Sequence, residues 1–448
     1  MNLRAQEPVA AATKWRDAGC GVAGGLLGGV VAAVFVVGVT TLIKANLDWI
    51  MRQGGGVMVA APFVGILVAV VVLHLVAHGR AVQQLSGDPA PPRSFTAWLR
   101  FPANAVRADL TADVVNTAGA EERFPWRLAP IRAVAIMATV GMGAPMGTES
   151  PAAHLGVAAG SALGERWRSL ARSAGIGGGA AGVAALMGLP LVGAAFILEL
   201  GRRNGAPLSL PRIVAASSGA LVGWGVNAAL DLNLIRLIVP HIAAGDLPRA
   251  LATAALVGAL SGAIGSVTGT AIYRARGWSA GPVVKFLVGA VTLGLCLVAI
   301  SKLASLAAAI GPGATAVSWA EVASASSWTL LAVVGLRAVA TTAAVLAGGC
   351  GGLFVPLLAI GDLTGRALAP VLGVPSDLAA AAGAAGSIAG GYRLPLTAIA
   401  MVLTIGGPVP ARLTCVTAVL FATGSGILAA YLLDRYVLHR RTASPAVS

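Results

Sequence analysis

The sequence predicts an all-α integral membrane protein with broken and re-entrant helices. Of its 448 residues, 57% are hydrophobic and only 11% are charged, whereas a soluble domain is about one quarter charged. Mean hydropathy is +0.84. The chain also contains 59 Gly and 24 Pro, too many for a bundle of uninterrupted helices. This composition excludes a soluble multidomain enzyme, a disordered chain and a disulfide scaffold.

Stretches without Asp, Glu, Lys or Arg mark the expected membrane elements. A helix needs about 20 residues to cross a hydrocarbon core of about 30 Å. Stretches 18–43, 53–79, 250–273, 338–361 and 413–433 are long enough. Others are shorter, such as 213–230, 286–301 and 394–411. Gly or Pro interrupts many of them, as is typical of transporter helices that end inside the protein.

The remaining segments predict a single membrane domain over residues 1–448. The first stretch, 18–43, is too long for a cleavable signal sequence, so we expect it to stay in the membrane. The polar segment 80–126 predicts a cytoplasmic connection with one or two short helices. Only about a dozen residues follow Tyr436, so we expect no soluble regulatory domain.

The basic residues indicate membrane topology, and neither they nor the cysteines indicate a further ligand. The net charge is +14, and its Arg and Lys residues collect between apolar runs, as the cytoplasmic excess of basic residues requires. Nucleic-acid binding needs a contiguous basic surface with aromatic stacking partners, and because these clusters are scattered we reject it. The four cysteines form no CxxC pair. We therefore expect neither a metal site nor a cofactor.

An internal repeat relates two parts of the chain at a separation of 205 residues. Its matched positions are Gly147 and Gly352, Pro151 and Pro356, Gly156 and Gly361, and the tripeptides Leu189-Pro190-Leu191 and Leu394-Pro395-Leu396. The pattern predicts two homologous halves, about 18–203 and about 212–434. The match alone leaves open whether they are inverted or parallel.

Both repeated motifs are expected to begin a helix deep in the membrane, because Pro is favoured in a first helical turn. They read Gly147-Thr148-Glu149-Ser150-Pro151 and Gly352-Leu353-Phe354-Val355-Pro356. A helix N-terminus offers free N–H donors and the positive end of the helix dipole. Two such ends that meet would form an anion site without Lys or Arg. The alternative is two ordinary helices that begin with Pro and hold no ligand.

Glu149 strengthens the interpretation as an anion site. It is the only charged residue between Arg132 and Glu165, and a carboxylate at membrane depth is a functional candidate by default. We interpret it as a tethered anion that occupies the site and leaves when it is protonated; the alternative is a cap on its own helix. Glu199 is less distinctive, because Arg202 and Arg203 follow within one turn and indicate an ion-paired helix end.

These motifs resemble the CLC family of chloride channels and proton/chloride exchangers. The resemblance rests on GTESP at 147–151, GGLFVP at 351–356, LPLVGAAFILE at 189–199 and LPLTAIAMVL at 394–403. It covers nearly the whole chain and is that of a divergent prokaryotic member without CBS domains. It implies an inverted-repeat homodimer in the inner membrane, with a separate pore in each subunit. It also implies that Glu149 is the gating glutamate, that N–H groups near Leu353 and Phe354 hold the anion, and that chloride or another halide is the bound substrate.

The sequence departs from the family pattern at several positions. Ser150 replaces the second Gly of GxEGP. The family's GSGIP stretch has no clean match, and its nearest register places Asn104 at the anion-contacting Ser. The pore tyrosine is expected to be Tyr436, with Tyr431 as the alternative. Leu200 stands where exchangers carry a second, proton-feeding glutamate, so we expect anion flux with weak or absent proton transport.

Other function classes fit the sequence less well. His74 and His78 lie four residues apart without the Glu that HExxH chemistry requires, which argues against an intramembrane metalloenzyme. A cation transporter would use helix C-termini and unwound carbonyls rather than helix N-termini. The prediction is transport of chloride or a similar small inorganic anion, gated by Glu149. Proton-coupled exchange by another route and fluoride selectivity stay open.

Overall fold

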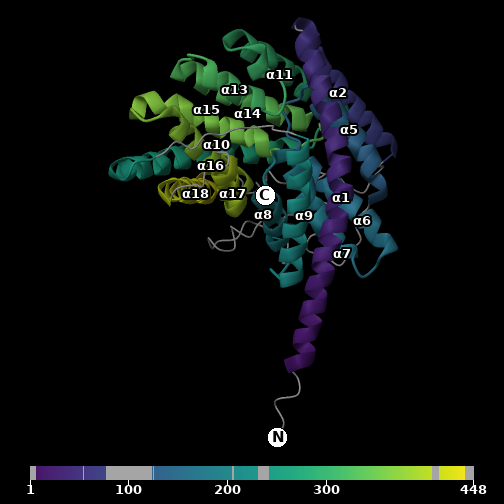
Figure 1. The fold of residues 1–448 in the computed structure, drawn as a ribbon. Coiled ribbons are helices and arrows are strands. Elements are labelled where there is room, and N and C mark those ends of the chain that lie inside the picture. Colours follow the sequence, from purple (N-terminus) through teal and green to yellow (C-terminus); the bar gives the residue numbers. More distant parts are fainter. Residues whose placement is uncertain are drawn as a thin grey trace, which may run out of the picture. The chain divides into compact units, whose positions relative to one another are not determined.

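A computed structural model describes residues 7–53, 55–76, 124, 126–203, 206–230, 242–405 and 413–438. The regular elements within these ranges are all helices (Figure 1). Among the described residues, a single isolated bridge pairs Gly147 with Gly352. Seven of the described helices are long and apolar enough to cross a membrane. The predicted all-α membrane architecture is therefore confirmed for the described part of the chain.

The chain divides into two compact units, each built from segments that are distant in sequence. The first unit comprises residues 1–40, 113–129 and 152–234. The second comprises residues 41–112, 130–151 and 235–448. Both repeated motifs, at 147–151 and 352–356, belong to the second unit.

In the first unit, small residues allow helices to pack backbone against backbone. It holds the start of α1 (Glu7–Gln53), most of α6 (Glu149–Arg166), the 3₁₀ turn η3 (Trp126–Leu128), α7 (Ala171–Met187), α8 (Pro190–Arg203) and α9 (Leu210–Ala229). A Cβ atom at Gly219 of α9 would lie 2.1 Å from the carbonyl oxygen of Gly177 in α7. No side chain fits there, so the two helices approach as closely as helices in membranes do when small residues face each other.

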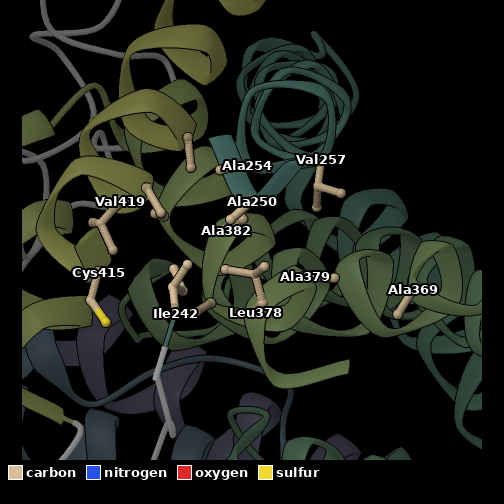
Figure 2. Close-up of a cluster of buried hydrophobic side chains, with 14 residues drawn as sticks. Ile242, Ala250, Ala254, Val257, Ala369, Leu378, Ala379, Ala382, Cys415 and Val419 are labelled. Carbon is tan, nitrogen blue, oxygen red and sulfur yellow. The ribbon is translucent and has the colours of Figure 1, made fainter. Parts of the chain in front are cut away.

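The second unit contains the remaining helices. They are α2 (Gly55–Val76), α5 (Ala129–Gly141), η4 (Ala244–Asp246), α10 (Leu247–Gly277), α11 (Pro282–Leu303), α12 (Leu306–Ala309), α13 (Ala314–Val322), α14 (Ser327–Leu346), α15 (Phe354–Leu372), α16 (Ser376–Tyr392), α17 (Pro395–Ile405), α18 (Leu413–Leu433) and the π-helical turn η5 (Asp434–Leu438). Its core cluster joins α10, α15, α16 and α18 and consists largely of alanines (Figure 2). Ala254, Ala379 and Ala422 are fully buried there. This packing fixes α15 and α16, which carry the candidate site.

Three consecutive helices repeat at the predicted spacing. α6 and α15 begin at residues 149 and 354, α7 and α16 at 171 and 376, and α8 and α17 at 190 and 395, each pair 205 residues apart. The two compact units do not coincide with the predicted halves 18–203 and 212–434. That division of the sequence into halves therefore stays a prediction.

The uncharged stretch 338–361 does not form one membrane helix, so a charge-free window alone does not give the limits of a helix. α14 ends at Leu346 and α15 begins at Phe354, with the Gly352 motif between them. Both helices also contain charged residues, Arg337 in α14 and the pair Asp362 and Arg366 in α15. Because these charges are buried with polar partners, they do not end the helices.

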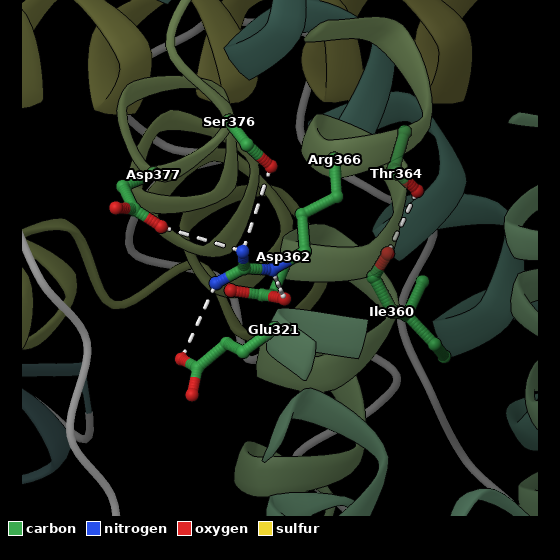
Figure 3. A network of polar contacts seen from close by, with 7 residues as sticks. All are labelled: Glu321, Ile360, Asp362, Thr364, Arg366, Ser376 and Asp377. Carbon is green, nitrogen blue, oxygen red and sulfur yellow. Dashed lines mark hydrogen bonds and ion pairs between the residues drawn. The ribbon is translucent and has the colours of Figure 1, made fainter. Parts of the chain in front are cut away.

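Arg366 is the centre of an ion-pair network at the C-terminal half of α15 (Figure 3). Its Nε donates to Asp362 at 2.8 Å, and its Nη atoms lie 3.3 Å from both Glu321 and Asp377. Asp362 is fully buried and Arg366 is 6% exposed. The pair is thus compensated inside an otherwise apolar helix, which is the condition for burying charge.

The predicted connection 80–126 lies outside the described residues, apart from Phe124 and Trp126. His78 lies outside them as well, and His74 falls in α2. α1 extends well past the uncharged stretch 18–43, to 47 residues. α11 likewise runs beyond 286–301, because its terminal turns carry Lys285 and Lys302.

Candidate functional site

Two reciprocal backbone hydrogen bonds hold the repeated motifs together. The N–H of Gly147 donates to the carbonyl oxygen of Gly352, and the N–H of Gly352 donates to that of Gly147, both at 2.6 Å. α6 begins at Glu149 and α15 at Phe354, two residues after the paired glycines. Both motifs are therefore helix N-termini, as predicted, and the second unit places them side by side.

Both paired positions require glycine, because there is no space for a side chain. A Cβ atom at Gly147 would lie 2.3 Å from Oε2 of Glu149 and 3.2 Å from Cδ of Pro356. A Cβ atom at Gly352 would lie 3.1 Å from the backbone nitrogen of Ser150. The shared Gly of the two motifs therefore leaves room for what lies between the two helix ends. Pro151 and Pro356 are both buried in the first turns that follow.

The Glu149 carboxylate occupies this space. The residue is 4% exposed, and the backbone amides of Glu149, Val355 and Thr148 lie close to its carboxylate. The Thr148 hydroxyl lies 3.5 Å from Oε1. Oε2 is buried and has no well-oriented hydrogen-bond partner among the described residues. A helix cap serves its own helix, whereas Val355 belongs to α15, so this carboxylate lies at the N-termini of two helices.

Tyr392, which the sequence patterns did not single out, also reaches both motifs. Its hydroxyl oxygen accepts a hydrogen bond from the backbone N–H of Leu353 at 3.1 Å and lies 2.9 Å from Oγ of Ser150. Its ring meets that of Phe354 edge-on, with centroids 5.8 Å apart. Tyr392 ends α16, two residues before the repeated Leu394-Pro395-Leu396. That position beside a repeat motif is the signal that could have identified it.

Of the other predicted pore residues, Tyr436 and Tyr431 make contacts with Arg435. Asn104 lies outside the described residues. Tyr436 is 51% exposed, and the guanidinium of Arg435 lies 5.4 Å from its ring. The Tyr431 hydroxyl accepts a hydrogen bond from Arg435 at 2.8 Å. Tyr436 lies in the π-helical turn η5, and its role as the pore tyrosine stays a prediction. Tyr392 contacts both motifs.

A buried cation lies beside the first turn of α15. Arg337 is 1% exposed and donates to the carbonyl oxygens of Ala308 at 2.7 Å and Gly311 at 2.9 Å. Its Nε has no hydrogen-bond partner within the described ranges. A Cβ atom at Gly313 would lie 3.3 Å from Nη2 of Arg337 and 3.4 Å from the carbonyl oxygen of Val355. The guanidinium therefore adds positive potential near the N-terminus of α15. A single Arg in an apolar stretch gave no sequence pattern that would have revealed this role.

The position after Glu199 provides no acid. Leu200 is fully buried in α8, and Glu199 is 9% exposed. Within the described ranges, no group of three or more His, Cys, Asp or Glu side chains is arranged to hold a metal ion.

Comparison with known proteins identifies the family. Residues 95–425 match the family model described as voltage gated chloride channel. The chain belongs to the CLC family. This CLC chain is 28% identical over 323 residues to the H(+)/Cl(−) exchange transporter ClcA of Yersinia pestis bv. Antiqua (strain Angola), covering 67% of this chain and 66% of that protein. It is 29% identical over 321 residues to ClcA of Salmonella typhi, covering 66% of each. The chain thus matches about two thirds of the length of these relatives.

Solved structures confirm the CLC fold. A CLC-type fluoride/proton antiporter superposes with a TM-score of 0.68 at 21% identity, covering 92% of this chain and 94% of that one. A slow cyanobacterial Cl−/H+ antiporter superposes with a TM-score of 0.70 at 18% identity, covering 94% and 98%. The predicted family and fold are both confirmed.

Proposed function

We propose that this CLC chain transports chloride or a similar small inorganic anion across a membrane, by a pathway gated by Glu149. One observation carries the proposal: a carboxylate, itself an anion, lies close to backbone amides at the N-termini of both α6 and α15. Neither motif contains a basic side chain. Donors that hold one anion without a counter-ion suit another anion of similar size.

Gating follows from competition for these donors. An ionised Glu149 and a transported anion carry like charges and need the same N–H groups, so both cannot occupy the site. Protonation of Glu149 removes its charge and weakens its hold on the amides. The side chain can then leave, and an anion takes its place. Flux should therefore rise as the pH falls.

The extent of proton coupling separates two candidate functions. We expect weak or absent coupling, because the buried Leu200 replaces the expected internal proton acceptor. The second candidate is proton-coupled exchange by another route. It is favoured by the relatives named H(+)/Cl(−) exchange transporters, and by the ability of Glu149 itself to carry a proton. Both chloride and fluoride are substrates named for proteins with this fold, so the anion is part of the same test.

The test is anion efflux from proteoliposomes under imposed chloride, fluoride or nitrate gradients, while a pH electrode records proton movement. Flux of at least one anion with little proton movement is the expected result. Proton uptake driven by a chloride gradient would favour the exchanger instead. Liposomes with correctly folded protein that pass none of the three anions faster than empty liposomes would contradict the proposal as a whole.

The assembly and location are further proposals. The family resemblance implies a homodimer in the inner membrane. Cross-linking in native membranes should trap a species of twice the subunit mass, and membrane fractionation should recover it with the inner membrane. A monomer under all cross-linking conditions would contradict the dimer.

A further inference from the structure

Two threonine side chains link the loops that lead into the paired motifs. Thr139 is fully buried in α5, and its hydroxyl oxygen accepts a hydrogen bond from the backbone N–H of Cys350 at 3.1 Å. Thr341 is 1% exposed in α14, and its hydroxyl donates to the carbonyl oxygen of Pro145 at 3.0 Å. Because α5 precedes the first motif and α14 the second, each threonine binds the loop of the opposite motif. The two bonds therefore cross between the loops.

The crossed bonds reach equivalent positions of the repeat. Pro145 and Cys350 are 205 residues apart, and each lies two residues before the paired glycine of its motif. The loops also share a backbone conformation: Gly143 and Gly348, again 205 residues apart, have φ angles of 92° and 94°. The N–H of each of these glycines donates to the carbonyl oxygen three residues earlier at 3.0 Å. The two threonines thus hold matched points of two matching loops.

The threonines themselves are not related by the repeat. The residue 205 positions after Thr139 is Ala344, and the residue 205 positions before Thr341 is Ile136. Neither alanine nor isoleucine carries a hydroxyl, so the crossed bonds do not follow from the repeat itself. A hydroxyl both donates and accepts, so the same side chain serves an N–H in one loop and a carbonyl oxygen in the other.

The crossed bonds hold the two helix ends at a fixed separation. The Gly147–Gly352 bonds connect the motifs at one pair of residues, about which two loops can rotate. The threonine bonds add two further points, each two residues before that pair. All of these groups are buried, and a buried hydrogen-bonding group is costly to leave without its partner. Rotation about the glycine pair would break both threonine bonds, so the amides of Thr148 and Val355 stay at one separation.

We propose that Thr139 and Thr341 are positioning residues that set which size of anion the site prefers. The inference rests on the proposed function, because it assumes that the amides of both motifs bind the transported anion. Donors held at one separation fit one ionic radius, whereas helix ends that can move apart also accept a larger ion. Fluoride is smaller than chloride, and chloride is smaller than bromide. The ratio of bromide affinity to fluoride affinity therefore reports the separation.

Isothermal titration with fluoride, chloride and bromide measures this ratio, and competition against chloride extends it to an ion that binds weakly. The parent of all variants is Glu149→Gln, which lacks the carboxylate charge. Thr139→Val and Thr341→Val keep the side-chain shape but remove the hydroxyl, so each should raise the bromide-to-fluoride ratio about fivefold, the effect of one buried hydrogen bond. Thr139→Ser and Thr341→Ser keep the hydroxyl and should retain the parent ratio. Thr342→Val is the matched control, because Thr342 donates to the carbonyl oxygen of Ala338 in its own helix at 2.8 Å.

The outcomes separate positioning from stability. A threonine that only stabilises the fold would lower the melting temperature of its valine variant and leave the ratio unchanged. An unchanged ratio in either valine variant that folds would overturn the inference, and so would an equal shift in Thr342→Val or in the serine variants. Thr139 and Thr341 lie in different helices, so one variant decides the question if the other does not fold. If folded Glu149→Gln binds none of the three anions, the proposed function itself fails, which is a different result from an unchanged ratio.

Discussion

Glu149→Gln changes one atom of the carboxylate and removes its charge. The described residues place one carboxylate, and no other acid, on the amides of Thr148, Glu149 and Val355. Release of a single ionised group should make wild-type flux rise about tenfold per unit fall in pH over the range in which Glu149 is ionised, and reach a plateau below it. A carboxylate and an anion about 4 Å apart repel each other by about 4 kcal/mol at an effective dielectric constant of about 20. Removal of that charge should raise anion affinity by up to about a thousandfold.

The assay is a flux–pH curve for wild type, Glu149→Gln and Glu149→Ala in the same liposomes. Both variants should give flat curves near the acid plateau of the wild type, and Glu149→Ala should also widen the path. Glu149→Gln keeps the backbone donors intact, so a loss of all flux is not expected. If Glu149→Gln retains the acid activation of the wild type, Glu149 only caps its helix and the gating assignment is wrong.

Three further substitutions test the surroundings of the site. Gly147→Ala should expel the Glu149 carboxylate, because the new Cβ would lie 2.3 Å from Oε2. Flux at alkaline pH should then rise toward that of Glu149→Gln. Gly225→Ala is the control, because the space around its Cβ position is open. Arg337→Met should weaken anion binding by about thirtyfold, the effect of about 2 kcal/mol between charges about 8 Å apart, whereas Arg337→Lys should keep most of the affinity in the same titration. Arg366→Met should lower the free energy of unfolding by about 3–5 kcal/mol, because it leaves Asp362 buried without its partner. In a thermal unfolding assay, Asp362→Leu/Arg366→Met should recover most of that loss. Equal stability of the single and double variants would refute this account.

The sequence predicted the helix N-termini and the tethered carboxylate because both depend on local chemistry. Pro in a first turn, Gly beside it and an isolated Glu are visible in the residues themselves, and the 205-residue repeat indicated that two such ends belong together. The reciprocal Gly147–Gly352 pairing is the structural form of that repeat.

Arg337 could not be predicted in the same way, and the only signal for Tyr392 was its position beside the repeated Leu394-Pro395-Leu396. Each lies in a separate helix, and neither carries a motif that links it to residues 147–151 or 352–356. Their roles arise from packing of α14 and α16 against the start of α15, which is a property of the fold. Helix limits were missed for a related reason: the buried pair Asp362 and Arg366 lies within α15, whereas a charge-free window treats every charge as an end.

Bromide scatters anomalously, and its position in crystals of Glu149→Gln tests the central claim most directly. We predict one anomalous peak between the N-termini of α6 and α15, within hydrogen-bonding distance of the backbone nitrogen of Val355. Peaks confined to the surface arginine clusters, with none between the two helix ends, would contradict the account.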